Sequence, residues 1–169
     1  SHQLKTLKLS RKSLIVVLEE PEKPGNIGAL YRTAAAAKID AIIISNPKTD
    51  FYNPNSIRSS LGDIFKIPTA IESNENVVSF LKKREFNILT TFIKKDSVRY
   101  DKFDYQLPCA LVIGSESKGL SNFWSKVANE NLVIPMAKTS NSLNLSVSAG
   151  ILIYEAARKN NKLDKNTIV

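Results

Sequence analysis

Polar side chains gather where an apolar helix is expected to begin, in the segment NSLNLSVSAGILIYEA from Asn141 to Ala156. A polar group at a buried helix start costs about 1–3 kcal/mol unless it finds a hydrogen-bond partner. Capping of the helix explains one such residue, but the run contains Asn141, Ser142, Asn144, Ser146 and Ser148. Leu143 and Leu145 alternate with polar neighbours, so we expect polar and apolar side chains to face different sides. The run predicts the wall of a ligand site.

A glycine turn with a carboxylate follows another apolar run, in LVIGSESKGLS from Leu111 to Ser121. A phosphate-binding P-loop is excluded, because it needs Lys and Ser or Thr directly after its second glycine, where this chain has Leu120. A dinucleotide-binding loop is not indicated either, since GNIG after the first apolar run lacks the third glycine. What remains is Glu116 between two glycines, which fits either a site or a plain surface turn.

A third polar group follows the first apolar run, in EEPEKPGNIGALYRTAAAA. Asn26 is placed to cap a helix, and Arg32 lies four residues after Gly28 on the same helical face. Long helical side chains lean toward the N-terminus, so Arg32 would pass over Gly28 toward the Asn26 amide. An ordinary capped helix with a solvated arginine explains these residues equally well.

Apolar runs separated by helix-like stretches predict an α/β fold. The runs are continuous rather than alternating, which is typical of a mostly parallel sheet with helices on both faces. Strands are expected at 13–19, 40–45, 86–93, 109–114 and 131–135. Helices are expected at 27–38, 54–61, 74–84, 120–127 and 145–159, with Ser73 and Ser121 as N-caps. Ligands of such folds bind at the carboxyl ends of the strands, where all three polar groups are expected.

Composition narrows the classes of function. The 24 Lys and Arg exceed the 16 Asp and Glu, and this net charge of +8 favours a polyanionic partner such as nucleic acid. His2 is the single histidine, which excludes a Ser–His–Asp site and any histidine-based metal site. Cys109 lies in the apolar run PCALVIG and is expected to be a buried core thiol. No apolar stretch reaches the length of a membrane span, so we expect a cytoplasmic protein.

Three motifs resemble, in order, those of the SpoU/TrmH branch of the SPOUT RNA methyltransferases. They are NxGxxxR at Asn26–Arg32, GxExxG at Gly114–Gly119 and IPM…SLNLSVSAG at Ile134–Gly150, and YNPNSIRSSLG from Tyr52 resembles the family's second helix. The resemblance implies transfer of a methyl group from S-adenosylmethionine to a ribose 2′-hydroxyl of tRNA or rRNA. It also implies a C-terminal deep trefoil knot, which nothing in the motif spacing predicts.

The resemblance assigns roles to nine residues. Gly114, Ile134, Leu143 and, close by, Met136 would bind S-adenosylmethionine. Ser142 and Asn144 would face the ribose and a catalytic Arg32, with Asn26 holding Arg32 and Glu116 fixing the arrangement. The reaction needs no metal. The family's usual mechanism makes the arginine the base; we favour phosphate positioning and stabilisation of the alkoxide, because a guanidinium stays protonated.

The resemblance also divides the chain and implies its assembly. Residues 13–160 would form the methyltransferase domain, after an N-terminal extension or tag remnant at 1–12 and before a tail at 161–169. A homodimer is expected, because the helix from Leu145 to Ala157 is apolar nearly all round. A non-catalytic RNA-binding module with the same fold is the main alternative, and the presence of all five assigned catalytic residues argues against it. Which RNA is methylated is left open.

Overall fold

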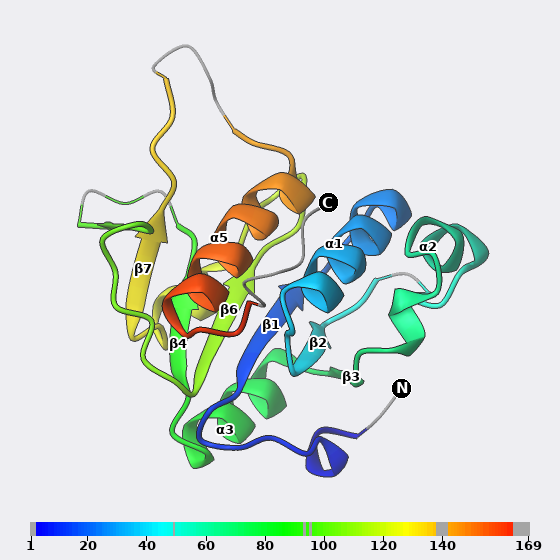
Figure 1. Ribbon diagram of the computed structural model, residues 1–169, viewed down its shortest axis with the longest axis horizontal. Coiled ribbons are helices and arrows are strands. Elements are labelled where there is room, and N and C mark those ends of the chain that lie inside the picture. The colour runs from blue at the N-terminus through cyan, green and yellow to red at the C-terminus, as the bar shows by residue number, and fades with distance from the viewer. Residues whose placement is uncertain (1–2, 49, 93, 95, 138–141, 164–169) are drawn as a thin grey trace.

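A computed structural model describes residues 3–48, 50–92, 94, 96–137 and 142–163, which form a seven-stranded sheet (Figure 1). The strand order is β3-β2-β1-β6-β4-β7-β5, and all neighbouring strands of the sheet are parallel. The strands are β1 (Leu14–Glu19), β2 (Ala41–Ser45), β3 (Thr69–Glu72), β4 (Asn87–Thr90), β5 (Val98–Arg99), β6 (Cys109–Ile113) and β7 (Glu130–Val133). The predicted parallel sheet is confirmed.

Helices cover both faces of this sheet. They are α1 (Pro24–Ala36), α2 (Pro54–Ser59), α3 (Asn74–Lys83), α4 (Asn122–Ser125) and α5 (Leu145–Lys159), with short 3-10 helices η1 (Leu4–Thr6) and η2 (Asp63–Phe65). Helices α1 and α5 lie side by side over one face, and α3 lies on the other (Figure 1). The fold is therefore a three-layer α/β/α arrangement.

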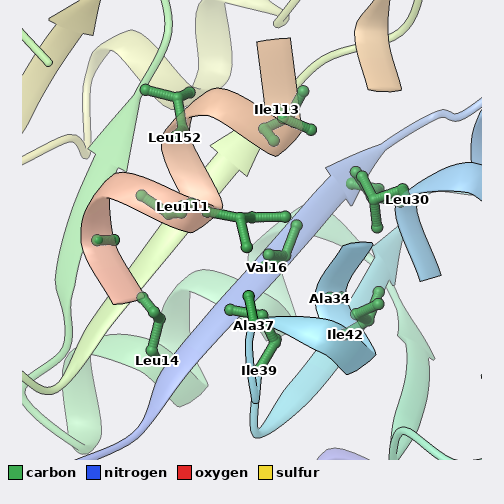
Figure 2. Close-up of a cluster of buried hydrophobic side chains, with 14 of the residues drawn as sticks. Leu14, Val16, Leu30, Ala34, Ala37, Ile39, Ile42, Leu111, Ile113 and Leu152 are labelled. Carbon is green, nitrogen blue, oxygen red and sulfur yellow. The ribbon is translucent and has the colours of Figure 1, made fainter. Parts of the chain in front are cut away.

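Alternate residues of β1 enter two separate cores. Leu14 and Val16 pack toward α1 and α5, in a cluster that also contains Leu30, Ala34 and Leu152 (Figure 2). Ile15 and Val17 point to the opposite face and pack with the α3 side chains Val77 and Leu81. Burial on both faces explains why the strand reads as a continuous apolar run.

The predicted elements exist, but several ends and two caps differ. Helix α1 begins at Pro24 with Lys23 as N-cap, so the prediction that Asn26 caps it is wrong; proline is well suited to the first helical position. The Ser73 hydroxyl accepts from the Asn76 N–H, as predicted. Ser121 precedes α4, but its hydroxyl makes no cap bond and donates to Glu19 instead. Strands β3 and β5 were not predicted.

Two expectations lie partly outside the described residues. The trefoil knot stays a prediction, and residues 138–141, between β7 and α5, are not described. The domain boundaries also stay predictions, with His2 and residues 164–169 outside the described part. Among the helices that are described, none is long and apolar enough to cross a membrane.

Gly28 permits close packing of α1 on α2, and this contact gives a stability test. A Cβ at Gly28 would lie 1.9 Å from Ser59 Oγ and 2.6 Å from the Ser59 backbone carbon. Gly28→Ala should therefore destabilise the fold by about 1–3 kcal/mol, lowering Tm by roughly 2–4 °C for each kcal/mol. Gly25→Ala in the same helix is the matched control, because nothing lies within 4 Å of its Cβ. Equal Tm values for the two variants, measured by thermal unfolding, would contradict this packing.

Candidate active site

A cavity of about 450 Å³ opens at the carboxyl ends of β4, β6 and β7. Its walls come from the loops that follow these strands, from the start of α5, and from Lys23 and Asn26 at the start of α1. Sheets of this kind bind their ligands at this edge. The cavity therefore lies where the three polar groups were expected.

Eight of the nine predicted site residues line this cavity. They are Asn26, Gly114, Glu116, Ile134, Met136, Ser142, Leu143 and Asn144. Arg32 is the exception, and Asn141 of the polar run lies outside the described residues. Segments far apart in the sequence thus meet around one cavity.

A chain of hydrogen bonds joins the three motifs. Glu116 Oε1 accepts from Asn26 Nδ2 at 2.9 Å and from the Lys23 N–H at 3.1 Å, and Oε2 accepts from the Glu22 N–H at 3.1 Å. Asn26 Oδ1 in turn accepts from Asn144 Nδ2 at 3.1 Å. Glu116 thereby satisfies backbone donors at the start of α1, where the N-cap Lys23 makes no side-chain bond. The network fixes α1 and α5 relative to the β6 loop.

Arg32 makes no hydrogen bond to Asn26 in the described structure, so the expectation that Asn26 holds it stays a prediction. Its side chain is exposed and makes no hydrogen bond or ion pair within the described part of the chain. A helix turns by about 100° per residue, so six residues separate Asn26 and Arg32 by roughly 120° around α1. Ser59 also fills the space over Gly28 through which Arg32 was expected to pass. The catalytic assignment of Arg32 therefore stays a prediction.

The polar run before α5 has two parts. Asn144 is the N-cap, with Oδ1 accepting from the Ser146 N–H at 2.9 Å and from Ser146 Oγ at 2.7 Å. Ser148 Oγ donates to the Asn144 and Leu145 carbonyls. Local bonds thus satisfy more of the run than predicted. Ser142, by contrast, lines the cavity with no partner among the described residues.

The expected separation of polar and apolar side chains in this run is wrong. Ser142, Leu143, Asn144 and Leu145 all line the cavity. Leu143 is 38% exposed, as is Met136 on the loop after β7, whereas Leu145 is 7% exposed and belongs to the core. Leu143 and Met136 give the cavity an accessible apolar wall.

Gly114 is required by the close approach of its own loop. A Cβ there would lie 2.0 Å from the Gly119 carbonyl carbon and 2.1 Å from the Leu120 nitrogen. Ser115 and Gly119 pair through two backbone hydrogen bonds, of 3.2 and 2.9 Å, and Gly119 has a positive φ of 66°. Both glycines of the GxExxG motif therefore shape the loop that presents Glu116.

Sequence reasoning missed a buried carboxylate behind this loop. Glu19, at the end of β1, is 2% exposed and accepts from Asn74 Nδ2 at 2.6 Å. It also accepts from the Ser121 N–H at 2.7 Å and from Ser121 Oγ at 2.6 Å. Its signal was a carboxylate directly after an apolar run. Lys23, Thr91 and Phe92 of the cavity lining were missed too; the last two lie within the strand predicted at 86–93, but β4 ends at Thr90.

Cys109 is a buried free thiol outside the cavity lining. Burial raises the pKa of the Cys109 thiol to about 12, which fits the predicted core thiol. Among the residues that the structure describes, no cluster of three His, Cys, Asp or Glu side chains could hold a metal ion.

The charge on Glu116 gives a pH test. Partial burial alone would raise the pKa of Glu116, but hydrogen bonds from Asn26 and from backbone N–H groups outweigh it, and the pKa is lowered. Its contribution to stability is therefore full above the usual pKa and lost as the pH falls through the lower folded value. Glu116→Gln should lower stability by roughly 1–2 kcal/mol at neutral pH, a value limited by solvent screening. Thermal unfolding from about pH 7 to about pH 3 should show this difference closing with acid; a constant difference would contradict the assignment.

Comparison with known proteins identifies the family. Residues 13–154 match the model of the SpoU rRNA Methylase family. The chain belongs to this family. The predicted resemblance to SpoU/TrmH methyltransferases is thereby confirmed.

Relatives of this SpoU-family chain are RNA methyltransferases by name. It is 34% identical over 150 residues to a 23S rRNA (uridine(2479)-2′-O)-methyltransferase of Streptomyces viridochromogenes, covering 85% of this chain and 52% of that protein. It is 33% identical to a tRNA (guanosine(18)-2′-O)-methyltransferase of Aquifex aeolicus, covering 90% and 72% respectively. The chain thus spans about half the length of the Streptomyces relative.

A solved structure agrees in fold. An AdoMet-bound rRNA methyltransferase from Sinorhizobium meliloti superposes with a TM-score of 0.88 at 30% sequence identity, covering 93% of this chain and 60% of that one. The arrangement of strands and helices described above is therefore that of the SpoU fold.

Proposed function

We propose that this protein transfers a methyl group from S-adenosylmethionine to a ribose 2′-hydroxyl of tRNA or rRNA. The observation that supports this proposal most strongly is the cavity at the carboxyl ends of the strands, where an apolar wall adjoins the Asn26–Glu116–Asn144 network. The family's relatives include enzymes named for 2′-O-methylation of 23S rRNA and of tRNA, which supports both the reaction and the class of substrate.

The cavity residues fit S-adenosylmethionine. A volume of about 450 Å³ lies within the usual range for small-ligand sites, roughly 300–1,000 Å³. Leu143 and Met136, which line the cavity, would offer apolar surface to the adenine, and the backbone of Gly114 and Ile134 would lie close to the ligand. When bound, the cofactor supplies an electrophilic methyl group.

The polar residues would prepare the ribose and its phosphate. Asn144 and Ser142 face the cavity from the start of α5 and would contact the substrate hydroxyl. Arg32, exposed on α1, would bind the adjoining phosphate and stabilise negative charge developing on the ribose oxygen. Asn26 and Glu116 hold α1 beside the cavity and would act as positioning residues. Proton loss would be concerted or phosphate-assisted, because a guanidinium is a poor base.

Calorimetric titration tests the cofactor assignment. We expect the protein to bind S-adenosylmethionine and to give no heat with NAD or ATP. Binding of tRNA without any binding of S-adenosylmethionine would favour the alternative, a non-catalytic RNA-binding module. Binding of NAD in place of S-adenosylmethionine would contradict both.

We also propose that the protein acts as a homodimer through α5. Val147 and Tyr154 are exposed, Ile151 is half-buried, and the three lie along one side of the helix at a spacing of four and three residues. Contact with a second copy would cover this apolar stripe. Sedimentation at micromolar concentration should give twice the mass of 18.8 kDa, and Val147→Glu should shift it to the monomer. A fully active wild-type monomer would reject the dimer.

A further inference from the structure

Seven exposed basic side chains lie at the amino ends of the strands, the opposite end of the sheet from the cavity. They come from residues 3–12, before β1, and 82–86, before β4, and we call them the basic edge: Lys5, Lys8, Arg11, Lys12, Lys82, Lys83 and Arg84. Glu85 is the only acidic residue in these two segments. These two segments therefore contain seven of the chain's 24 basic residues and a single carboxylate.

Apolar packing brings the two segments together. Leu4 and Leu7 are buried in the same cluster as Leu81 of α3 and Phe86. The N-terminal segment consequently runs past α3 before entering β1 (Figure 1). A hollow of about 240 Å³ between the segments is lined by side chains of both, and an ion pair between Arg11 and Glu85 joins them.

Most of this charge has no partner within the protein. Arg11 pairs with Glu85, and Arg84 lies over the Phe80 ring at 4.8 Å. The side chains of Lys8, Lys12, Lys82 and Lys83 make no hydrogen bond or ion pair with any described residue. Lysines in the last turn of α3 complement its dipole, but this does not explain Lys8 and Lys12 on another segment.

The loops after β1 and β6, beside the cavity, have a more even charge balance. They carry Glu20, Glu22 and Glu116 together with Lys23 and Lys118. Charges of both signs are therefore mixed there, whereas the basic edge has seven basic residues and one carboxylate.

We propose that the basic edge binds backbone phosphates of the RNA substrate, away from the nucleotide that is methylated. This proposal rests on the proposed function for its choice of polyanion. The basic edge and the cavity lie at opposite ends of β1, whose six residues span about 20 Å. The bound RNA must therefore extend at least that far beyond its target ribose. Phosphate contacts of this kind supply affinity and orientation without reading sequence.

An anionic membrane fits this surface less well than RNA does. Helices that lie on membranes combine basic residues with apolar side chains that enter the lipid. The exposed large apolar side chains of the described chain are Leu61, Phe65, Met136, Leu143, Val147 and Tyr154, and none belongs to the basic edge. The surface is basic and hydrophilic, as a phosphate-binding surface should be.

A pair of double variants tests the proposal with an unmodified tRNA transcript as the probe. Lys12→Gln with Lys83→Gln removes two free lysines of the basic edge. Lys66→Gln with Lys102→Gln removes the same charge from exposed lysines outside the basic edge. Their neighbours Ile64 and Phe103 pack in the core beneath α1 and α5, and Lys66 pairs with Asp63. Affinity is measured by fluorescence anisotropy between about 50 and about 200 mM salt.

The basic-edge variant should bind tRNA about tenfold more weakly, and the slope of log affinity against log salt should fall by about 2. The control should change affinity less than about twofold, and both variants should keep the wild-type Tm and S-adenosylmethionine affinity. Unchanged tRNA binding by the basic-edge variant, or an equal loss in the control, would overturn the proposal. Binding of phosphatidylserine vesicles but not of tRNA by the wild type would overturn it too. Absence of S-adenosylmethionine binding would contradict the methyltransferase proposal alone. The tRNA titration contains no cofactor, so it tests the basic edge independently.

Discussion

Replacing Arg32 by alanine should lower methyl transfer to RNA by roughly 10²–10³-fold or more, the effect of losing a group that stabilises charge in a transition state. Arg32 lies outside the cavity lining, so the affinity for S-adenosylmethionine should stay within about twofold of wild type. Arg32→Lys should rescue turnover poorly, because an ammonium cannot form the planar two-pronged contact of a guanidinium with phosphate.

Arg99→Ala provides the control for loss of an exposed arginine. Arg99 pairs with Asp101 on the edge strand β5 and has no proposed role in the reaction. Its replacement should leave turnover near the wild-type value. Turnover of Arg32→Ala within a few-fold of wild type would remove Arg32 from the mechanism and leave the cavity assignment intact.

Leu143→Asp should abolish measurable binding of S-adenosylmethionine. The side chain lines the cavity, and a carboxylate placed against an adenine ring in an apolar wall costs several kcal/mol, or more than about a hundredfold in affinity. Leu61→Asp is the matched control, because Leu61 is also exposed but lies outside the cavity. Circular dichroism of both variants checks the fold, and calorimetry measures the affinity.

Asn144 should behave in the opposite way. Asn144→Ala loses both the N-cap of α5 and the bond to Asn26, whereas Asn144→Ser keeps a capping hydroxyl and loses only the amide donor. Both variants should hold S-adenosylmethionine affinity within about tenfold while turnover falls much further. Cofactor affinity governed by Asn144, with Leu143→Asp indifferent, would contradict the roles proposed for these two residues.

The sheet could be predicted from sequence because its central strands are buried on both faces. Runs such as LIVVLE and CALVI stand out by apolar continuity, and the structure places both in the middle of the sheet. Strands β3 and β5 were not predicted, because they have only four and two residues and are the two outermost strands of the sheet. Short edge strands carry too little apolar pattern to be distinguished from loops.

The meeting of the motif residues at one end of the sheet was predictable, but their mutual contacts were not. Motif residues after β6 and β7 do line one cavity, because parallel strands end at a common edge. The start of α1, however, is fixed by Glu116, which lies 90 residues from Asn26 in the sequence. No local sequence pattern predicts a hydrogen bond between residues so far apart in the chain. The buried Glu19 was missed for the same reason, since its donors are the first residue of α3, Asn74, and the N-cap of α4, Ser121.

Transfer of an isotopically labelled methyl group from S-adenosylmethionine to RNA tests the central proposal most directly. The protein is incubated separately with tRNA and with rRNA, and the RNA is digested to nucleosides and analysed by mass spectrometry. We expect label in a ribose 2′-O-methylated nucleoside from one of the two RNAs, and none when Arg32→Ala replaces the wild type. Label on a base, or no label in either RNA from protein that binds S-adenosylmethionine, would contradict it.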